Sequence, residues 1–176
     1  MNDESRWIDQ AKEGDHKAFK LLYGQYVTPL YRFMRQFSSD PDEAEEWTQR
    51  AFIKAFEHLH GFDGRARFSS WLFKLALNEM RMDRRRATIV PFISSTNDEY
   101  SSEPEPDLIE WRETMRTWLE DLDETKRTVF VLYEVEGYSH AEIASLLEIG
   151  ESTSRTILSR TKQYLKTRWQ SEEAGR

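Results

Sequence analysis

Positively charged side chains that could bind phosphates or bases are concentrated near the C-terminus. Residues 152–170 contain no acidic side chain and five cationic ones, namely Arg155, Arg160, Lys162, Lys166 and Arg168. Such cations pair with phosphates, and an arginine can also donate hydrogen bonds to a base edge. Hydroxyl groups that can reach the same partners stand at Ser152, Thr153, Thr156 and Ser159. The stretch therefore favours binding to nucleic acid.

Two helices joined by a tight turn would position these cations. Gly137 can end a preceding helix in the left-handed conformation, and Ser139 with Glu142 forms a capping box that begins a new helix. After the turn, Ser152 or Thr153 can cap the next helix. A short helix, a turn and a longer basic helix are typical of a helix-turn-helix, whose second helix enters the DNA major groove. An ordinary helical hairpin with a solvated basic face is the alternative.

A second group of cations lies between residues 65 and 86, where seven lysines and arginines occur against only two acids. These cations follow a glycine-containing loop and lie mostly on a predicted helix over about 69–86. Aromatic residues among basic ones could stack single-stranded bases and neutralise phosphates. Plain core packing is the alternative for Phe62, Phe68 and Trp71, and for Trp71 we favour it.

Carboxylates gather in two other segments. One begins a predicted helix from Pro41 to about His60, where Asp40 can act as the cap and the acids suit the positive end of the helix dipole. Taken alone, the polar side chains on the outer faces of this helix indicate only a solvated surface. The other segment, 87–107, lacks periodicity and is rich in serine, proline and acids, which predicts an acidic linker. Separate basic and acidic segments suggest separate partners.

The fold class predicted from these patterns is all-α, with two small helical domains joined by the acidic flexible linker. Of the 176 residues, 32% are charged and 38% are hydrophobic, and no apolar run is long enough to cross a bilayer. Further helices are predicted over 4–12, over 15–37, from 107 and over 123–137. The apolar stripes of these helices predict their core residues. They place Phe56 of the 41–60 helix, Leu75 of the 69–86 helix and Val135 of the 123–137 helix in the core. The predicted domains are 1–86 and 107–170, with a linker over 87–106 and a frayed polar tail over 171–176.

Residue types that carry catalysis or bind metals are missing or badly spaced. Cysteine is absent, and no two of the four histidines are four residues apart, namely His16, His58, His60 and His140. Neither a glycine-rich phosphate loop nor a nucleophile elbow occurs. We therefore expect no enzyme activity, metal, cofactor or small-molecule substrate. The first 15 residues lack a basic segment followed by an apolar one, so we expect no signal peptide and a cytoplasmic protein.

Together these motifs resemble the extracytoplasmic-function group of bacterial sigma factors over nearly the whole chain. The family's opening helix is similar to AFKLLYGQYVTPLYRFMRQF, and its D-x-x-D-A-E-D-x-x-Q-E-x-F signature is similar to DPDEAEEWTQRAFIKAF. The promoter-melting pattern F-x-x-W-L-x-x-[IL]-A-x-N is intact in FDGRARFSSWLFKLALNEMRMDRRR. The second domain resembles the L-P-x-x-x-R-x-V-F-x-L-x-x-x-E-G-x-S-x-x-E-I-A element. The order and spacing of these segments are together very specific.

Seven positions depart from the family's pattern. They are Trp47 for an aliphatic residue, Arg50 for Glu, Asp123 for Pro, Glu148 for Gly, Gly150 for Pro, Ser154 for a core Val and Ile157 for a basic residue. These departures bear on the angle of the second helix and on individual contacts, not on the class.

The resemblance implies an initiation factor without catalysis of its own, which joins core RNA polymerase and brings it to a promoter. The acidic helix would dock on the coiled-coil of the largest polymerase subunit through Asp42, Glu43, Glu46, Gln49, Arg50 and Ile53. The first domain would hold the melted −10 element, with one base unstacked near the 62–68 loop, through Phe62, Arg65, Phe68, Lys74, Asn78, Arg81, Arg84 and Arg85. The second domain would bind the −35 duplex through Ser152, Thr153, Arg155, Thr156, Ser159, Arg160 and Lys162. Among these, Arg155 would contact a base and Lys162 a phosphate.

The partners that the resemblance implies are core RNA polymerase, promoter DNA and an anti-sigma factor, which in this group is often anchored in the membrane. The acidic linker would thread the RNA exit path of the polymerase. Two alternatives come from other classes of protein. A helix-turn-helix regulator could bind duplex DNA without being a polymerase subunit, although this would leave the 65–86 cations unused. A purely structural helical adaptor would not support promoter-dependent transcription.

Overall fold

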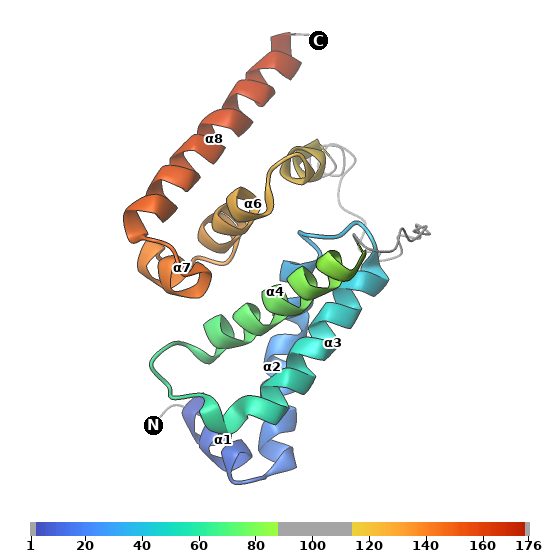
Figure 1. Ribbon diagram of the computed structural model, residues 1–176, viewed down its shortest axis with the longest axis vertical. Coiled ribbons are helices and arrows are strands. Elements are labelled where there is room, and N and C mark those ends of the chain that lie inside the picture. The colour runs from blue at the N-terminus through green and yellow to red at the C-terminus, as the bar shows by residue number, and fades with distance from the viewer. Residues whose placement is uncertain (1–2, 88–113, 175–176) are drawn as a thin grey trace. The chain divides into compact units, whose positions relative to one another are not determined.

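The chain forms two compact units of helices, 1–98 and 99–176 (Figure 1). The computed structural model describes residues 3–87 and 114–174, and within these ranges it contains helices and no strand. The all-α class with two helical domains is therefore confirmed. The predicted linker, 87–106, lies almost wholly between the two described ranges. The predicted domain boundaries, at its two ends and before the C-terminal tail, stay predictions.

Four α-helices and a short 3-10 turn make up the first unit: α1 (Asp3–Lys12), α2 (His16–Met34), α3 (Pro41–His58), η1 (Leu59–Gly61) and α4 (Phe68–Ala87). Helices α2, α3 and α4 pack against one another, and α1 packs against α2 (Figure 1). Local capping determines two of the helix starts. Asp15 accepts hydrogen bonds from the amides of Lys17 and Ala18, and Asp40 accepts one from the amide of Asp42.

Several residues predicted to face the core of the first unit are less buried than expected, among them Leu75 and Phe56. Because α4 packs against both α2 and α3, it buries two pairs of consecutive residues. These pairs are Leu72 with Phe73 and Ala76 with Leu77. Leu75, which was predicted to face the core, is only half-buried. Phe56 is 46% exposed rather than buried. Its ring lies at the edge of the core, covered on one side by the rings of His16 and Phe19 at centroid distances of 5.5 and 5.1 Å.

The second unit contains helical residues 114–120, α6 (Glu124–Phe130), η2 (Val131–Val135), α7 (His140–Leu147) and α8 (Glu151–Ala174). Helices α6 and α7 both pack against α8, and Trp118, Leu119, Leu122 and Leu165 form one buried cluster. The segment η2 is a turn of π-helix, whose wider turn takes its last side chains out of the α-helical register. Val135, predicted to be internal, is therefore 61% exposed, whereas Val131 and Leu132 are fully buried.

Helix α8 begins earlier and ends later than the sequence indicated. It starts at Glu151, so the prediction that Ser152 or Thr153 acts as its cap is wrong, and both lie within the first turn. It continues to Ala174, so the predicted frayed tail is wrong for residues 171–174. The indole nitrogen of Trp118 donates a hydrogen bond of 3.1 Å to Glu172, which holds this end of the helix. No helix in the described ranges is both long and apolar enough to span a membrane.

Candidate nucleic-acid interface

The predicted helix-turn-helix is present as α7, a tight turn and α8. Gly137 has a φ of 70°, and Ser139 and Glu142 form the reciprocal capping box that begins α7. Helix α7 ends at Leu147, and the next residue, Glu148, caps it in the left-handed conformation with φ 58° and ψ 41°. This conformation is unfavourable for a residue with a side chain, and it reverses the chain direction before α8.

The outer face of α8 carries all seven side chains that were predicted to contact duplex DNA. The buried face is formed by Ser154, Leu158, Thr161 and Leu165, which recur at helical spacing. The exposed side chains are Ser152, Thr153, Arg155, Thr156, Ser159, Arg160 and Lys162. They begin in the first turn, which is the part of a recognition helix that reaches base edges.

Two of these cations already have carboxylate partners. Arg155 forms an ion pair with Glu151 one turn earlier on α8. Lys162 donates a hydrogen bond of 2.8 Å to Glu134 of η2, and this bond together with the charge of the carboxylate raises the pKa of Lys162. Both side chains remain exposed, so a phosphate or base can compete for them at the surface.

A polar contact joins the two helices of the motif. The Nδ1 atom of His140, at the start of α7, lies 3.0 Å from the hydroxyl oxygen of Ser154 in α8. The ring of His140 also stacks on Tyr133, with centroids 4.5 Å apart. No local sequence pattern predicts this contact, because His140 and Ser154 are 14 residues apart.

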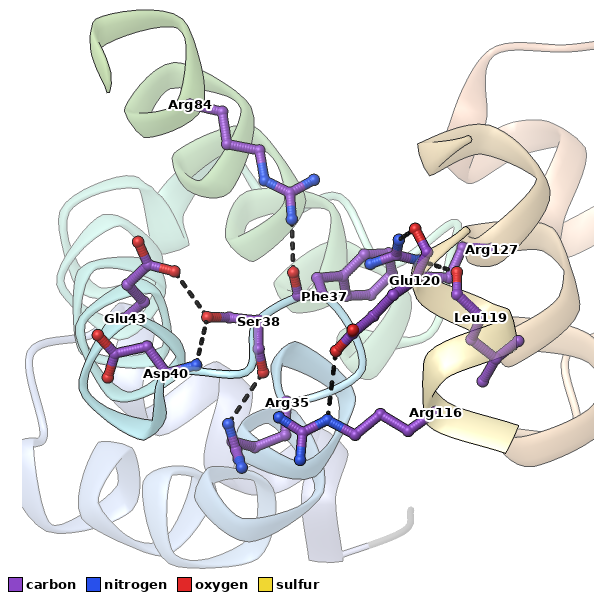
Figure 2. Close-up of polar contacts among 10 residues, drawn as sticks. All are labelled: Arg35, Phe37, Ser38, Asp40, Glu43, Arg84, Arg116, Leu119, Glu120 and Arg127. Atoms are coloured by element: carbon purple, nitrogen blue, oxygen red, sulfur yellow. Dashed lines mark hydrogen bonds and ion pairs between the residues drawn. The ribbon is translucent and has the colours of Figure 1, made fainter. Parts of the chain in front are cut away.

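In the first unit, α3 presents an acidic surface. Asp42, Glu43, Glu46, Gln49 and Ile53 are exposed, as a docking face requires. Before α3, Ser38 donates a hydrogen bond of 2.6 Å to Glu43 and accepts one of 2.9 Å from the amide of Asp40 (Figure 2). The first turn of this acidic surface is thereby held in place by the preceding loop.

Arg50, the other predicted residue of this surface, is half-buried and directed toward α4. It pairs with Glu46 and donates a hydrogen bond of 3.2 Å to Asp83. Burial lowers the pKa of Arg50, but the hydrogen bond that it donates to Asp83 and the nearby negative charges outweigh this and raise the pKa overall. No local pattern predicts this contact, because Arg50 and Asp83 are 33 residues apart.

The two aromatic rings predicted to lie near an unstacked base are buried. Phe62 is 6% exposed and Phe68 is 1% exposed, and their centroids are 5.7 Å apart in an edge-to-face arrangement. The ring of Trp71 is half-buried, and its centroid lies 5.2 Å from that of Phe62. Lys12 donates a hydrogen bond of 2.6 Å to the carbonyl of Phe62. Both phenylalanine rings thus take part in core packing, the alternative considered for them, while Arg65 in the loop between them is exposed.

The α4 residues predicted to hold the −10 strand differ in exposure. Asn78 and Arg85 are exposed, whereas Lys74, Arg81 and Arg84 are half-buried. Arg84 donates a hydrogen bond to the carbonyl of Phe37 (Figure 2), and its guanidinium carbon lies 5.7 Å from the centre of the Trp47 ring. Arg84 therefore has a structural contact within the unit. Among residues 3–87 and 114–174, no group of three potential metal ligands occurs.

Two family profiles match the chain. The profile described as Sigma-70 region 2 matches residues 22–89, and the profile described as Sigma-70, region 4 matches residues 112–165. The RNA polymerase sigma-H factor of Pseudomonas aeruginosa is 26% identical over 179 residues, covering 94% of this chain and 93% of the relative. The ECF RNA polymerase sigma-E factor of Escherichia coli is 27% identical over 172 residues, covering 90% of each chain.

Solved structures show the same fold. The structure of CnrH in complex with the cytosolic domain of CnrY has a TM-score of 0.75 at 22% identity, and the match covers 97% of this chain and 99% of that chain. The sigma factor RpoE from Bartonella quintana, in complex with the anti-sigma factor NepR, has a TM-score of 0.73 at 24% identity, and the match covers 86% and 96% of the two chains.

Proposed function

Since this chain belongs to the extracytoplasmic-function group of sigma-70 transcription initiation factors, we propose how its residues divide between polymerase and promoter. The family directs core RNA polymerase to specific promoters, and its members are initiation factors rather than enzymes. The second unit would bind the −35 element as duplex, the first unit would bind the melted −10 element, and α3 would bind the polymerase.

Contact with the −35 duplex is assigned to the first turns of α8. The observation that carries the proposal is the exposure of all seven predicted side chains on one polar face that begins at the helix-turn-helix. Arg155 can donate to a base edge once it leaves Glu151, and Lys162 can exchange Glu134 for a phosphate. Base contact gives sequence discrimination, whereas phosphate contact gives affinity for any sequence.

The melted −10 strand is assigned to α4 and to the loop before it. Arg65, Asn78 and Arg85 are exposed along this surface and can hold phosphates or an unstacked base. Phe62 and Phe68 are given an indirect role, because their buried rings anchor both ends of the loop. Unstacking one base costs a few kcal/mol, so the loop must be held ready to bind it.

Core polymerase is assigned to the exposed face of α3. Carboxylates at Asp42, Glu43 and Glu46, with the amide of Gln49 and the apolar side chain of Ile53, make a surface that complements a basic partner with one apolar position. We further propose that an anti-sigma factor binds this chain and that the protein acts in the cytoplasm. The complex of the sigma factor RpoE with the anti-sigma factor NepR supports the first of these points.

A regulator that binds duplex DNA without joining polymerase is the second candidate. It is supported by the helix-turn-helix alone and leaves the acidic face of α3 without a partner. Binding to core polymerase separates the two candidates.

Run-off transcription with the native core polymerase and genomic fragments tests the proposal. We expect new transcripts that require the protein, and their start sites would define both promoter elements. Arg155→Ala should relax discrimination at the −35 base that Arg155 contacts, by about 1–3 kcal/mol. Lys166→Ala, which removes one exposed charge three turns further along α8, is the matched control and should retain the same start sites. If the polymerase neither binds the protein nor starts at new sites, the regulator becomes the better account.

A further inference from the structure

Two side chains of α3 meet on one carboxylate of α4. The indole nitrogen of Trp47 donates a hydrogen bond of 3.1 Å to one oxygen of Asp83, and Arg50 donates one of 3.2 Å to the other oxygen. Trp47 is 1% exposed, and the side chains of Arg50 and Asp83 are 31% and 29% exposed. Each oxygen of Asp83 thus has a donor from α3 in a partly desolvated site, where such bonds are stronger than at an open surface.

Asp83 occupies a sensitive position in α4. It is the only acid among residues 80–87, a stretch that contains four arginines. A carboxylate at this position would compete with phosphate for those arginines unless its charge were neutralised from another direction. Arg50 supplies that charge from α3. The neighbouring Arg84 also contacts α3, because its guanidinium group lies over the Trp47 ring.

We propose that Arg50 is a positioning residue for promoter melting, not a direct contact of the polymerase. Through Asp83 it fixes the basic end of α4 on α3 and keeps the only carboxylate there away from the DNA strand. The helix that binds polymerase is thereby joined to the helix that binds the melted strand. This inference rests on the proposed assignment of α4 to the −10 element.

The glutamate that the family usually has at this position would have the opposite effect in this chain. Arg50→Glu would place three carboxylates together, with Glu46 and Asp83 as the other two. Asp83 would then turn toward the arginines of α4. Asp83→Asn in the same chain removes one of the three charges and still leaves an oxygen to accept the hydrogen bond from Trp47.

The experiment compares polymerase binding with promoter opening. Wild type, Arg50→Glu, Arg50→Lys and the double variant Arg50→Glu/Asp83→Asn are each titrated with core polymerase, and opening is then measured at saturation by permanganate reactivity of melted thymines. Lys54→Glu is the matched control, because it makes the same change of charge one turn along α3, where Lys54 pairs with Glu57 of the same helix.

We expect Arg50→Glu to reduce opening about tenfold, the scale of one hydrogen bond between charged groups in a partly buried site, with less than about threefold change in polymerase affinity. Arg50→Lys and the double variant should regain most of the opening, and Lys54→Glu should open as wild type does. Equal loss of polymerase affinity and opening in Arg50→Glu, not regained in the double variant, would make Arg50 a polymerase contact and overturn the proposal.

Two further results also decide the question. Normal opening by Arg50→Glu would mean that the bridge to Asp83 has no role in melting. If Arg50→Glu does not fold, Arg50→Gln replaces it, because this variant removes the charge without adding another, and normal opening would again overturn the inference. Failure of the wild-type protein to open any promoter would count against the function itself, which keeps the two failures distinct.

Discussion

His140 Nδ1 lies 3.0 Å from the hydroxyl oxygen of Ser154, a side chain with no exposed surface in α8. The ring of His140 stacks at the same time on Tyr133 of η2. This polar pair stands at a core position where the related family usually has an apolar valine. The packing of α7 against α8, which sets how the recognition helix is presented, therefore depends on a hydrogen bond.

Removing that hydroxyl group should loosen the helix-turn-helix. We expect Ser154→Ala to lower the free energy of unfolding of the second unit by about 1–2 kcal/mol, because it leaves the ring nitrogen of His140 without its partner and a small void beside it. Amide hydrogen exchange of α7 and α8 in the intact chain measures this. Ser145→Ala, at an exposed position of α7, is the control and should change stability by less than about 0.5 kcal/mol. Equal exchange in the two variants would contradict the prediction.

Asp123 makes the stability of the second unit depend on pH. It caps α6 by accepting a hydrogen bond of 2.9 Å from the amide of Lys126, and the side-chain hydrogen bond from Lys126 lowers the pKa of Asp123. Because the folded-state pKa is lowered, this stabilisation is complete above the ordinary carboxyl pKa of about 4 and is lost as the pH falls through the lower value. We expect Asp123→Ala to cost about 1 kcal/mol at pH 7 and less once the pH has fallen through the lowered pKa of Asp123, because the charged part of the cap is then lost.

Urea unfolding from pH 7 down to strongly acidic pH checks this dependence. Asp123→Asn is the matched variant, because it keeps the oxygen that accepts the capping hydrogen bond and removes the charge. The difference in free energy of unfolding between Asp123→Asn and Asp123→Ala should not change with pH. A constant difference between wild type and Asp123→Ala across the whole range would show that the cap acts without its charge.

Helix starts could be predicted from the sequence because each depends on a few neighbouring residues. Asp15, Asp40, Asp123 and Ser139 each bond to an amide two or three residues further along, so residue type and spacing contain the whole interaction. The exposed face of α8 was predictable for the same reason, since helical periodicity places polar residues opposite Leu158 and Leu165. The family resemblance then supplied the roles.

Contacts across the fold could not be predicted in this way. The bridge from Trp47 to Asp83 joins residues 36 apart, and nothing near either one indicates the other. The turn of π-helix at η2 has no simple sequence signature, so the exposure of Val135 was missed. Aromatic rings such as Phe62 and Phe68 suit both stacking on bases and packing in a core, so their residue type alone does not distinguish the two roles. Only the arrangement of α1, α2 and α4 around them shows that they are buried.

Arg127 is a buried cation whose contribution to stability can be measured directly. Its guanidinium group donates hydrogen bonds of 2.7 Å to the carbonyls of Leu119 and Glu120, at the end of the helix containing residues 114–120 (Figure 2). It donates another of 3.3 Å to the carbonyl of Leu122. Leu119 and Glu120 lie in the last turn of this helix, where carbonyls lack the usual intrahelical partner four residues further along. We expect Arg127→Met to lower the free energy of unfolding of the second unit by about 3 kcal/mol, because several polar groups lose their partner at once.

Arg127→Lys separates charge from geometry. A lysine keeps the positive charge near the negative end of the helix dipole but cannot span three carbonyls with one planar group. It should therefore recover only part of the loss, and amide exchange in α6 should fall between wild type and Arg127→Met. If the lysine variant were as stable as wild type, the charge alone would account for the effect.

Glu148 holds the turn of the helix-turn-helix in a conformation that suits glycine better. Its φ of 58° places the side chain in the left-handed region, which costs an L-residue about 1–2 kcal/mol. Glycine avoids this strain but loses more backbone entropy on folding, so we expect Glu148→Gly to stabilise the second unit by about 0.5–1 kcal/mol. The matched substitution Ser145→Gly, at a helical φ in α7, should destabilise it by about 1 kcal/mol. Amide exchange of α7 should therefore slow in the first variant and speed up in the second, and faster exchange in both would mean that interactions of the Glu148 side chain outweigh its backbone strain.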